Sequence, residues 1–299
     1  MSWIFFAIAG YFLYSVVVVT NKFLLRQRAT TRPLVFTFWI GVLSIFTFVL
    51  APFGLSWPGW GLFIYDILVG LVFFLALLAF YRALDINEAS RIAPVIGGLI
   101  PVFVFPFAYL FLAERLAWLQ ILAFALLVSG GLLISLKIER GVLKEGLKSL
   151  KIVILAILLG AIYWIMAKYA FDQQGFITGF VWTRLGLVIG ALLILIYAPW
   201  RRMILSSFRQ ATGEVSVLMG SSKLLAGFGS LFVHLALSCA SASLVQALQG
   251  AEYVFLLALT VILSKKFPEV LKEKLSGGII LQKIIAVLLI VAGLAILAI

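Results

Sequence analysis

Four ionisable side chains stand out inside long apolar runs of the sequence: Arg184, Lys223, His234 and Glu252. Charged groups at membrane depth are costly, and they commonly mark substrate sites, ion sites or proton relays. Glu252 lies roughly 16 Å into its run at 1.5 Å per residue, near the midplane of a hydrocarbon core about 30 Å thick. A carboxylate at that depth indicates solute or proton binding.

Lys223 and Glu252 lie on consecutive runs joined by a short link, so we expect these runs to be antiparallel neighbours. Both charges would then lie near mid-membrane. We therefore predict that they interact, either as a static ion pair that fixes packing or as part of a site for substrate or protons. Gln246 and Gln249 share a helical face with Glu252. They are expected to face a cavity, or to join helices by hydrogen bonds.

The predicted substrate site lies near the midplane between two halves of the chain. It comprises Glu252, Gln249, Gln246 and Lys223 on one side and Tyr81, Lys22 and Tyr14 on the other. Glu252 and His234 are candidates for proton coupling, His234 because a histidine pKa lies near neutrality. A structural role for His234 is the alternative. A zwitterionic cargo would suit a Lys and a Glu in one chamber, whereas an apolar or cationic cargo would suit Glu252 alone.

The elements that must position these side chains follow from the composition. Hydrophobic residues make up 65% of the 299 residues and charged residues 11%, whereas a soluble domain is about half apolar and about a quarter charged. These values exclude a soluble globule and a disordered chain. Apolar runs of about 20 residues predict an all-α membrane protein with ten transmembrane helices. The spans are Trp3–Thr20, Leu34–Ala51, Leu62–Leu84, Ala89–Ala113, Leu116–Leu136, Ile152–Phe171, Phe176–Ala198, Val215–Leu237, Ser241–Leu263 and Ile279–Ile299.

The segments between the spans are too short to form a soluble domain. The first span has no basic stretch before it, so we interpret it as a retained helix rather than a signal peptide. Residues 200–214 are expected to be a plain connector. Residues near 265–278 fit either a short amphipathic interfacial helix or a charged loop. Pro94, Pro101 and Pro106 predict a bent fourth helix, which is either a moving part or a static kink.

An internal repeat relates the two halves. At an offset of 153 residues, Ala89-Ser90 and Gly97 match Ala242-Ser243 and Gly250, and Tyr81 aligns with His234. We predict a first five-helix repeat over 1–136, a basic connector over 137–151, and a second five-helix repeat over 152–299. Because five is odd, the second half enters the membrane from the opposite side, which is the inverted arrangement of many secondary transporters.

The stretch "YRALDINEASRIAPVIGGLIPVFVFPFAYLFLAERLAWLQILAFALLVSGGLLI" resembles the drug/metabolite transporter superfamily, in its ten-helix EamA-like family. Glu252-Tyr253-Val254-Phe255 stands where the family usually has Glu-Pro-Val-Phe, and "SKKFPEVLKEKL" replaces the second family turn. Lys22 and Lys168 also look like family positions. The resemblance implies a transporter of small metabolites, with a cavity lined chiefly by the first, third, fourth, sixth, eighth and ninth helices.

We therefore expect a secondary transporter that moves a small organic metabolite, amino acid-like or drug-like, across the cell membrane by alternating access. Proton coupling and uniport both stay open. The alternatives are a facilitative channel and a non-transporting receptor. An enzyme is not expected, since Ser221 and His234 lie about 20 Å apart along one helix. One Cys and one His predict no metal site. No cofactor or nucleic acid is expected; the partners are the solute and the lipid bilayer, with the chain a monomer or homodimer.

Sequence and resemblance disagree on orientation. Loops after odd-numbered spans carry 18 Lys and Arg residues, and loops after even-numbered spans carry 2. The positive-inside rule places the basic side in the cytoplasm, with both termini outside. Family members of this kind usually have both termini inside. We predict the orientation that the charge count gives.

Overall fold

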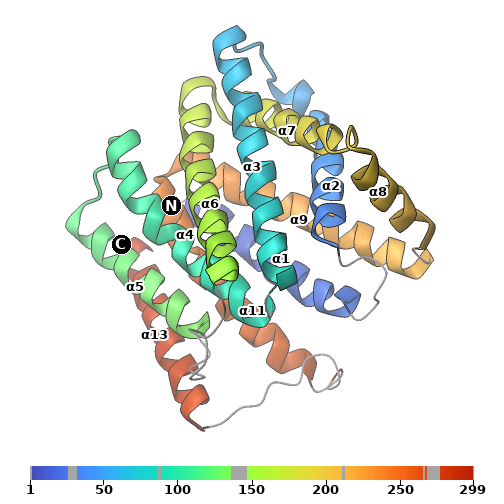
Figure 1. The fold of residues 1–299 in the computed structure, drawn as a ribbon. Coiled ribbons are helices and arrows are strands. Elements are labelled where there is room, and N and C mark those ends of the chain that lie inside the picture. Colours follow the sequence, from blue (N-terminus) through green and yellow to red (C-terminus); the bar gives the residue numbers. More distant parts are fainter. Residues whose placement is uncertain are drawn as a thin grey trace.

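The structure is a computed structural model, in which every regular element of the described residues is a helix (Figure 1). The described residues are 2–25, 32–86, 89–135, 147–210, 213–264, 267 and 277–298. The helices are α1 (Ser2–Leu25), α2 (Pro33–Leu43), η2 (Ser44–Phe53), α3 (Trp60–Ile86), α4 (Ala89–Phe111), α5 (Trp118–Ser135), α6 (Leu147–Gln174), α7 (Phe176–Leu193), α8 (Ala198–Gln210), α9 (Gly213–Cys239), α10 (Ala242–Ala247), α11 (Gln249–Ser264) and α13 (Gly277–Ala298).

Eight spans within the described residues are long and apolar enough to cross a membrane. Two shorter apolar helices, Val95–Phe111 and Trp118–Ile134, lie where the fourth and fifth spans are predicted. The all-helical membrane class is confirmed. The count of ten spans stays a prediction.

The outer surface of the bundle is apolar, as lipid requires. Large side chains such as Phe5, Trp60, Phe111, Trp118 and Leu281 remain exposed. Exposed apolar area on this scale would drive aggregation in water, whereas it matches the hydrocarbon of a bilayer.

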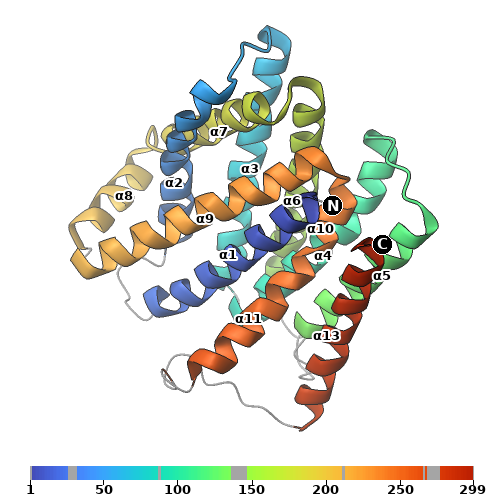
Figure 2. The same cartoon turned by 180° about the vertical axis from the view of Figure 1, so that it is seen from behind.

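The helix contacts repeat between the two halves. α1 lies between α9 and α11 and packs on both (Figure 2). In the other half of the bundle, α6 packs on α3 and α4. Exchanging α1 with α6, α9 with α3 and α11 with α4 turns the first set of contacts into the second. This exchange supports the predicted repeats over 1–136 and 152–299, which stay a prediction.

Small residues bring α1 and α9 close together. A Cβ added to Gly10 would lie 2.8 Å from the Gly229 carbonyl oxygen, and one added to Gly229 would lie 3.0 Å from the Tyr14 ring. Glycine at such crossings allows close backbone approach in membranes. The contact fixes Tyr14 of α1 beside Ser230 of α9.

The ninth predicted span is interrupted rather than continuous. α10 ends at Ala247, and α11 begins at Gln249. At the junction the Ala251 N–H bonds to the Leu248 carbonyl at 2.9 Å, which is the tighter 3₁₀ spacing. Glu252 therefore lies in the first turn of α11. The fourth helix, in which the prolines predict a bend, is assigned as one helix over Ala89–Phe111.

The connectors differ from expectation. Residues 200–214 are largely helical, because α8 extends over Ala198–Gln210. This helix is amphipathic, with Arg201 and Arg202 exposed and Ile204 buried, as suits a membrane surface. The predicted connector 137–151 is helical from Leu147 onward, and its earlier residues lie outside the described part. The insertion near 265–278 also lies largely outside it.

Candidate functional site

A buried arginine lies near the middle of α7. Arg184 is 5% exposed, and its Nη2 donates to the Ser230 hydroxyl at 2.6 Å and to His234 Nε2 at 3.4 Å. Its guanidinium carbon lies 4.7 Å from the centre of the Phe180 ring and 5.0 Å from that of Phe73. A guanidinium stays charged in proteins, so this site carries a fixed positive charge within the apolar core.

The hydrogen bonds of His234 define its tautomer. Nδ1 lies 2.7 Å from the Ser230 carbonyl oxygen, which only an N–H can approach as a donor. Nε2 is therefore the acceptor, and it lies 2.5 Å from the Tyr163 hydroxyl. The ring also stacks on Trp164, with centroids 4.9 Å apart. Both nitrogens of the neutral ring are thus engaged, so the structure favours the structural role of His234 over proton transfer.

Two tyrosines of α1 connect this arginine to the interrupted helix. Tyr14 interacts with both Ser230 and Arg184, and its ring lies edge-on to Tyr11 at 6.3 Å. The Tyr11 hydroxyl donates to the Val245 carbonyl of α10 at 2.9 Å. Gln246 Nε2 donates to the same hydroxyl at 3.4 Å. These contacts link α9, through the two tyrosines of α1, to α10.

Glu252 lies at the other end of this path. Its side chain is 9% exposed, and it lies within electrostatic range of Tyr11, Tyr14 and Tyr253. No Lys, Arg or His among the described residues forms an ion pair with it. We refer to the side chains around Arg184, those around Glu252 and those between them as the central polar cluster. It comprises Tyr11, Tyr14, Tyr163, Arg184, Ser230, His234, Gln246 and Glu252.

The predicted interaction between Lys223 and Glu252 is wrong as an ion pair. The Lys223 ammonium lies over the Phe36 ring of α2, 4.6 Å from its centroid. Tyr81 also stacks on the Phe36 ring, with the two ring centroids 5.4 Å apart. The physical reason is that α9 and α11 are not neighbours in space, since α1 lies between them (Figure 2). The short link makes the two helices close in the sequence, but they do not pack against each other.

The two remaining predicted residues are placed differently. Gln249 lies against α4, because a Cβ built on Gly97 would be 3.0 Å from its Nε2. Lys22 is in α1, and its side chain lies outside the described part of the structure. The structure therefore brings together Tyr14, Gln246, His234 and Glu252, and separates Lys223 and Tyr81 from them. Among the described residues no three His, Cys, Asp or Glu side chains are placed to hold a metal ion.

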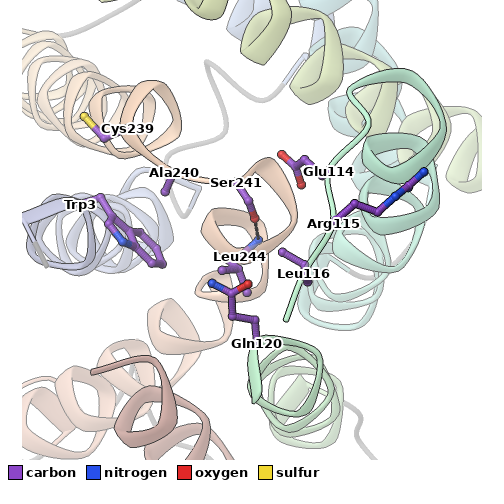
Figure 3. Close-up of a pocket in the computed structure, with 9 residues that line it drawn as sticks. All are labelled: Trp3, Glu114, Arg115, Leu116, Gln120, Cys239, Ala240, Ser241 and Leu244. Atoms are coloured by element: carbon purple, nitrogen blue, oxygen red, sulfur yellow. Dashed lines mark hydrogen bonds between the residues drawn. The ribbon is translucent and has the colours of Figure 1, made fainter. Parts of the chain in front are cut away.

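A cavity of about 320 Å³ opens where the two halves meet at one end of the bundle (Figure 3). Glu114, from the loop after α4, points across it to the start of α10. Its carboxylate accepts from the Ala242 N–H at 2.6 Å and from the Ser243 hydroxyl at 2.9 Å. This contact caps the N-terminus of α10. Arg115 points away and lies over Tyr109 at 3.7 Å.

A family model matches the first part of the chain. The model of the EamA-like transporter family matches residues 1–136. Over these residues the match agrees with the resemblance predicted from the sequence.

The fold of the whole chain is also shared. A solved structure described as "Crystal structure of protein" covers 99% of this chain and 95% of its own, with a TM-score of 0.67 and 16% identity. At that identity the likeness shows the fold alone. Among curated proteins, none matches this sequence. The EamA-like family consists of transporters, which agrees with the expectation that the chain is not an enzyme.

Sequence reasoning missed part of the cluster. Arg184 was visible as an ionisable residue in an apolar run, but no sequence signal linked it to Ser230 or Tyr163. Serine and tyrosine are common in apolar helices, so their types alone do not mark a site. Glu114 stands in the family turn "LAERL", and its partner Ser243 lies two residues after Ser241, the N-cap serine that marks the start of α10.

Proposed function

We propose that this protein is a secondary transporter that moves a small organic solute across the cell membrane by alternating access. The central polar cluster is its binding site. Arg184 and Glu252 are the charged ligands, while Tyr14, Tyr163 and Gln246 supply neutral hydrogen bonds. The proposal extends the family assignment of residues 1–136 to a mechanism for the whole chain.

One observation carries this proposal. Two side chains of opposite charge are buried, Arg184 near the middle of α7 and Glu252 in the first turn of α11, and neither has an opposite charge beside it among the described residues. An unpaired charge in the interior is strongly unfavourable. Such residues persist where a ligand or water from a pathway completes their coordination.

The helix arrangement supports alternating access. α1 of the first half contacts α9 and α11, and α6 of the second half contacts α3 and α4. Two equivalent packing sets allow two states that differ by rocking of one half against the other. The interruption between α10 and α11 lies next to Glu252, and discontinuous helices at mid-membrane are a common feature of such sites.

Counterflow in proteoliposomes tests the proposal. Purified protein is reconstituted in vesicles that are loaded with unlabelled solute, and entry of the labelled solute is followed. Candidate solutes are first selected by their effect on the apparent melting temperature of the protein. A carrier gives saturable entry that preloading accelerates.

A facilitative channel gives the opposite pattern. Flux through it rises without saturation, and preloading gives no acceleration. Proton coupling is tested in the same vesicles by dissipating an imposed pH gradient. If net uptake is unaffected, the transporter is a uniporter or exchanger.

A further inference from the structure

A second carboxyl group is buried outside the central polar cluster, at the contact between α3 and α6. Asp66 lies six residues after the start of α3, and its side chain is 0% exposed. Both of its oxygens lie 2.8 Å from Nε2 of Gln174, the last residue of α6. The two helices pack side by side (Figure 1) and belong to the two predicted repeats. This contact therefore joins the two halves of the chain.

The other ionisable side chains around this contact have different partners. Tyr65 donates to a backbone carbonyl of α6 and packs edge-on against Tyr169. Lys168 and Asp172 of α6 pair with each other at 2.7 Å. α7, which also packs on α3, contributes Arg184, and that guanidinium is bonded to α9. Among the described residues, no cation forms an ion pair with the buried carboxyl.

The Gln174 amide and the Asp66 carboxyl are each only partly satisfied. Gln174 Oε1 is buried and has no hydrogen-bond partner among the described residues. Nε2 approaches both carboxyl oxygens equally, whereas the two N–H bonds of an amide diverge too widely to point at both. An ionised Asp66 would therefore receive about one good hydrogen bond for its four or so lone-pair sites. A buried charge with so few partners is strongly unfavourable.

A proton on Asp66 satisfies both groups. A carboxylic acid carries an O–H donor, and Gln174 Oε1 is an acceptor that lies on the facing amide. A small rotation of the amide lets Nε2 donate to one oxygen of Asp66 while the other oxygen donates to Oε1. If the amide is turned over instead, Oε1 takes the place of Nε2 beside the two carboxyl oxygens, and three acceptors can meet there only with a proton between them.

We propose that Asp66 is a proton-binding site, in which the carboxylic acid and the Gln174 amide join α3 to α6 by two hydrogen bonds. Acidic residues at membrane depth commonly take part in proton relays. Gln174 is partly exposed at the end of α6, so the proton enters from that side of the membrane. Its loss breaks one of the two bonds and leaves a buried negative charge, which weakens the contact between the halves. The site is separate from the central polar cluster and does not depend on it.

Infrared spectroscopy of the purified protein in detergent tests for this proton. At neutral pH we expect the wild type to show the carbonyl band of a carboxylic acid that Asp66→Asn lacks. The asparagine N–H takes the place of the acid O–H, so this variant should keep both hydrogen bonds. Asp172→Asn is the matched control, since it changes an exposed carboxylate on the same part of α6. The control should keep the band.

The pH dependence of stability gives a second readout. An aspartic acid is ionised above about pH 4 in an unfolded chain, so a protein that holds the Asp66 proton when folded releases it on unfolding. Stability then falls as the pH rises, by up to about tenfold in the unfolding equilibrium per pH unit. From about pH 5 to 7, the apparent Tm of the wild type should fall relative to that of Asp66→Asn by about 2–3 °C per pH unit. The offset between the wild type and Asp172→Asn should stay constant.

Gln174→Leu tests the pairing itself, and it decides the question if Asp66→Asn fails to fold. Without the amide donor, the acid carbonyl loses a hydrogen bond, so its infrared band should move to higher frequency.

Three results would each overturn the proposal. One is an acid band that is the same in the wild type and Asp66→Asn, which would mean that Asp66 is ionised. Another is a constant Tm offset between these two proteins as the pH rises. The third is an acid band that Gln174→Leu leaves unmoved. None of these readouts requires transport, so they separate failure of this site from failure of the proposed function.

Discussion

Glu114→Ala is expected to leave the N-terminus of α10 without its cap. The Glu114 carboxylate, from the first half of the chain, binds that helix start in the second half and so joins the two halves there. Its two oxygens accept from the Ala242 N–H at 2.6 Å, the Ser243 hydroxyl at 2.9 Å and the Ser243 N–H at 3.4 Å. The Ser241 hydroxyl accepts the next N–H, that of Leu244, at 3.1 Å. Together these side chains satisfy the donors of the first turn.

The size of the effect follows from those contacts. Loss of a helix cap costs about 0.5–2 kcal/mol, and hydrogen bonds to a charged group contribute about 1.5–3 kcal/mol. Glu114 is partly exposed, so water replaces part of the loss. We expect Glu114→Ala to lower the free energy of unfolding by about 1–2 kcal/mol. The apparent Tm should fall by about 2–3 °C.

The assay uses a probe that the chain already contains. Cys239 is the single cysteine of the sequence, and it is exposed and lines the same cavity as Glu114 (Figure 3). Maleimide labelling of Cys239 should be faster in Glu114→Ala than in the wild type, because the contact across the cavity is lost. Apparent Tm is measured in parallel by size-exclusion chromatography after heating in detergent.

The neighbouring residue provides the control. Arg115 contacts Tyr109 only within its own half, by a 3.3 Å hydrogen bond and a ring contact. Arg115→Ala should therefore change the apparent Tm by less than about 1 °C, as for other exposed side chains. If the two variants behave alike in both measurements, Glu114 does not hold the halves together and the reasoning is refuted.

Three further predictions test the side-chain packing of the bundle. Lys223→Met should leave counterflow within about twofold of the wild type, because the ammonium lies on an aromatic ring rather than against a carboxylate; a larger loss would return Lys223 to the site. Gly186→Ala should destabilise the protein by about 1–3 kcal/mol, since the added Cβ would lie 2.8 Å from Ile67 Cα. The control is Gly220→Ala, whose added Cβ would have no atom within 4 Å. In a thermal melt this control should be neutral or stabilising. Buried Asp66 accepts from the Gln174 amide at 2.8 Å through each oxygen, so Asp66→Leu should lower the apparent Tm more than Asp66→Asn; equal effects would show that this bond is unimportant.

Much of the fold follows from simple periodic and compositional signals. Long apolar runs predicted the helices because only a fully bonded backbone is stable in lipid. The order of small residues indicated the repeat, and the helix contacts are consistent with it. The amphipathic α8 was missed because its short apolar stripe was interpreted as the edge of a connector. The interruption at Leu248 has no Pro or Gly at the break itself, so the sequence carries no clear signal for it.

The site was predicted less completely, for a geometric reason. Glu252, Gln246, Tyr14 and His234 were selected by residue type and depth, and the structure places them in one cluster. Lys223 was assigned to Glu252 because consecutive helices were assumed to be neighbours. Insertion of α1 between α9 and α11 breaks that assumption. Which helix lies between two others depends on the packing of the whole bundle, and one sequence does not specify it.

Counterflow by two forms of the protein tests the central claim most directly. Vesicles with Arg184→Gln are compared with vesicles with Arg201→Gln, at matched protein content and with the same preloaded solute. The account predicts saturable exchange for Arg201→Gln and a loss of at least about tenfold for Arg184→Gln, as expected when a charged hydrogen bond to the solute is removed. Equal exchange by the two variants would show that solute passes without contacting Arg184, and would contradict a binding site at the central polar cluster.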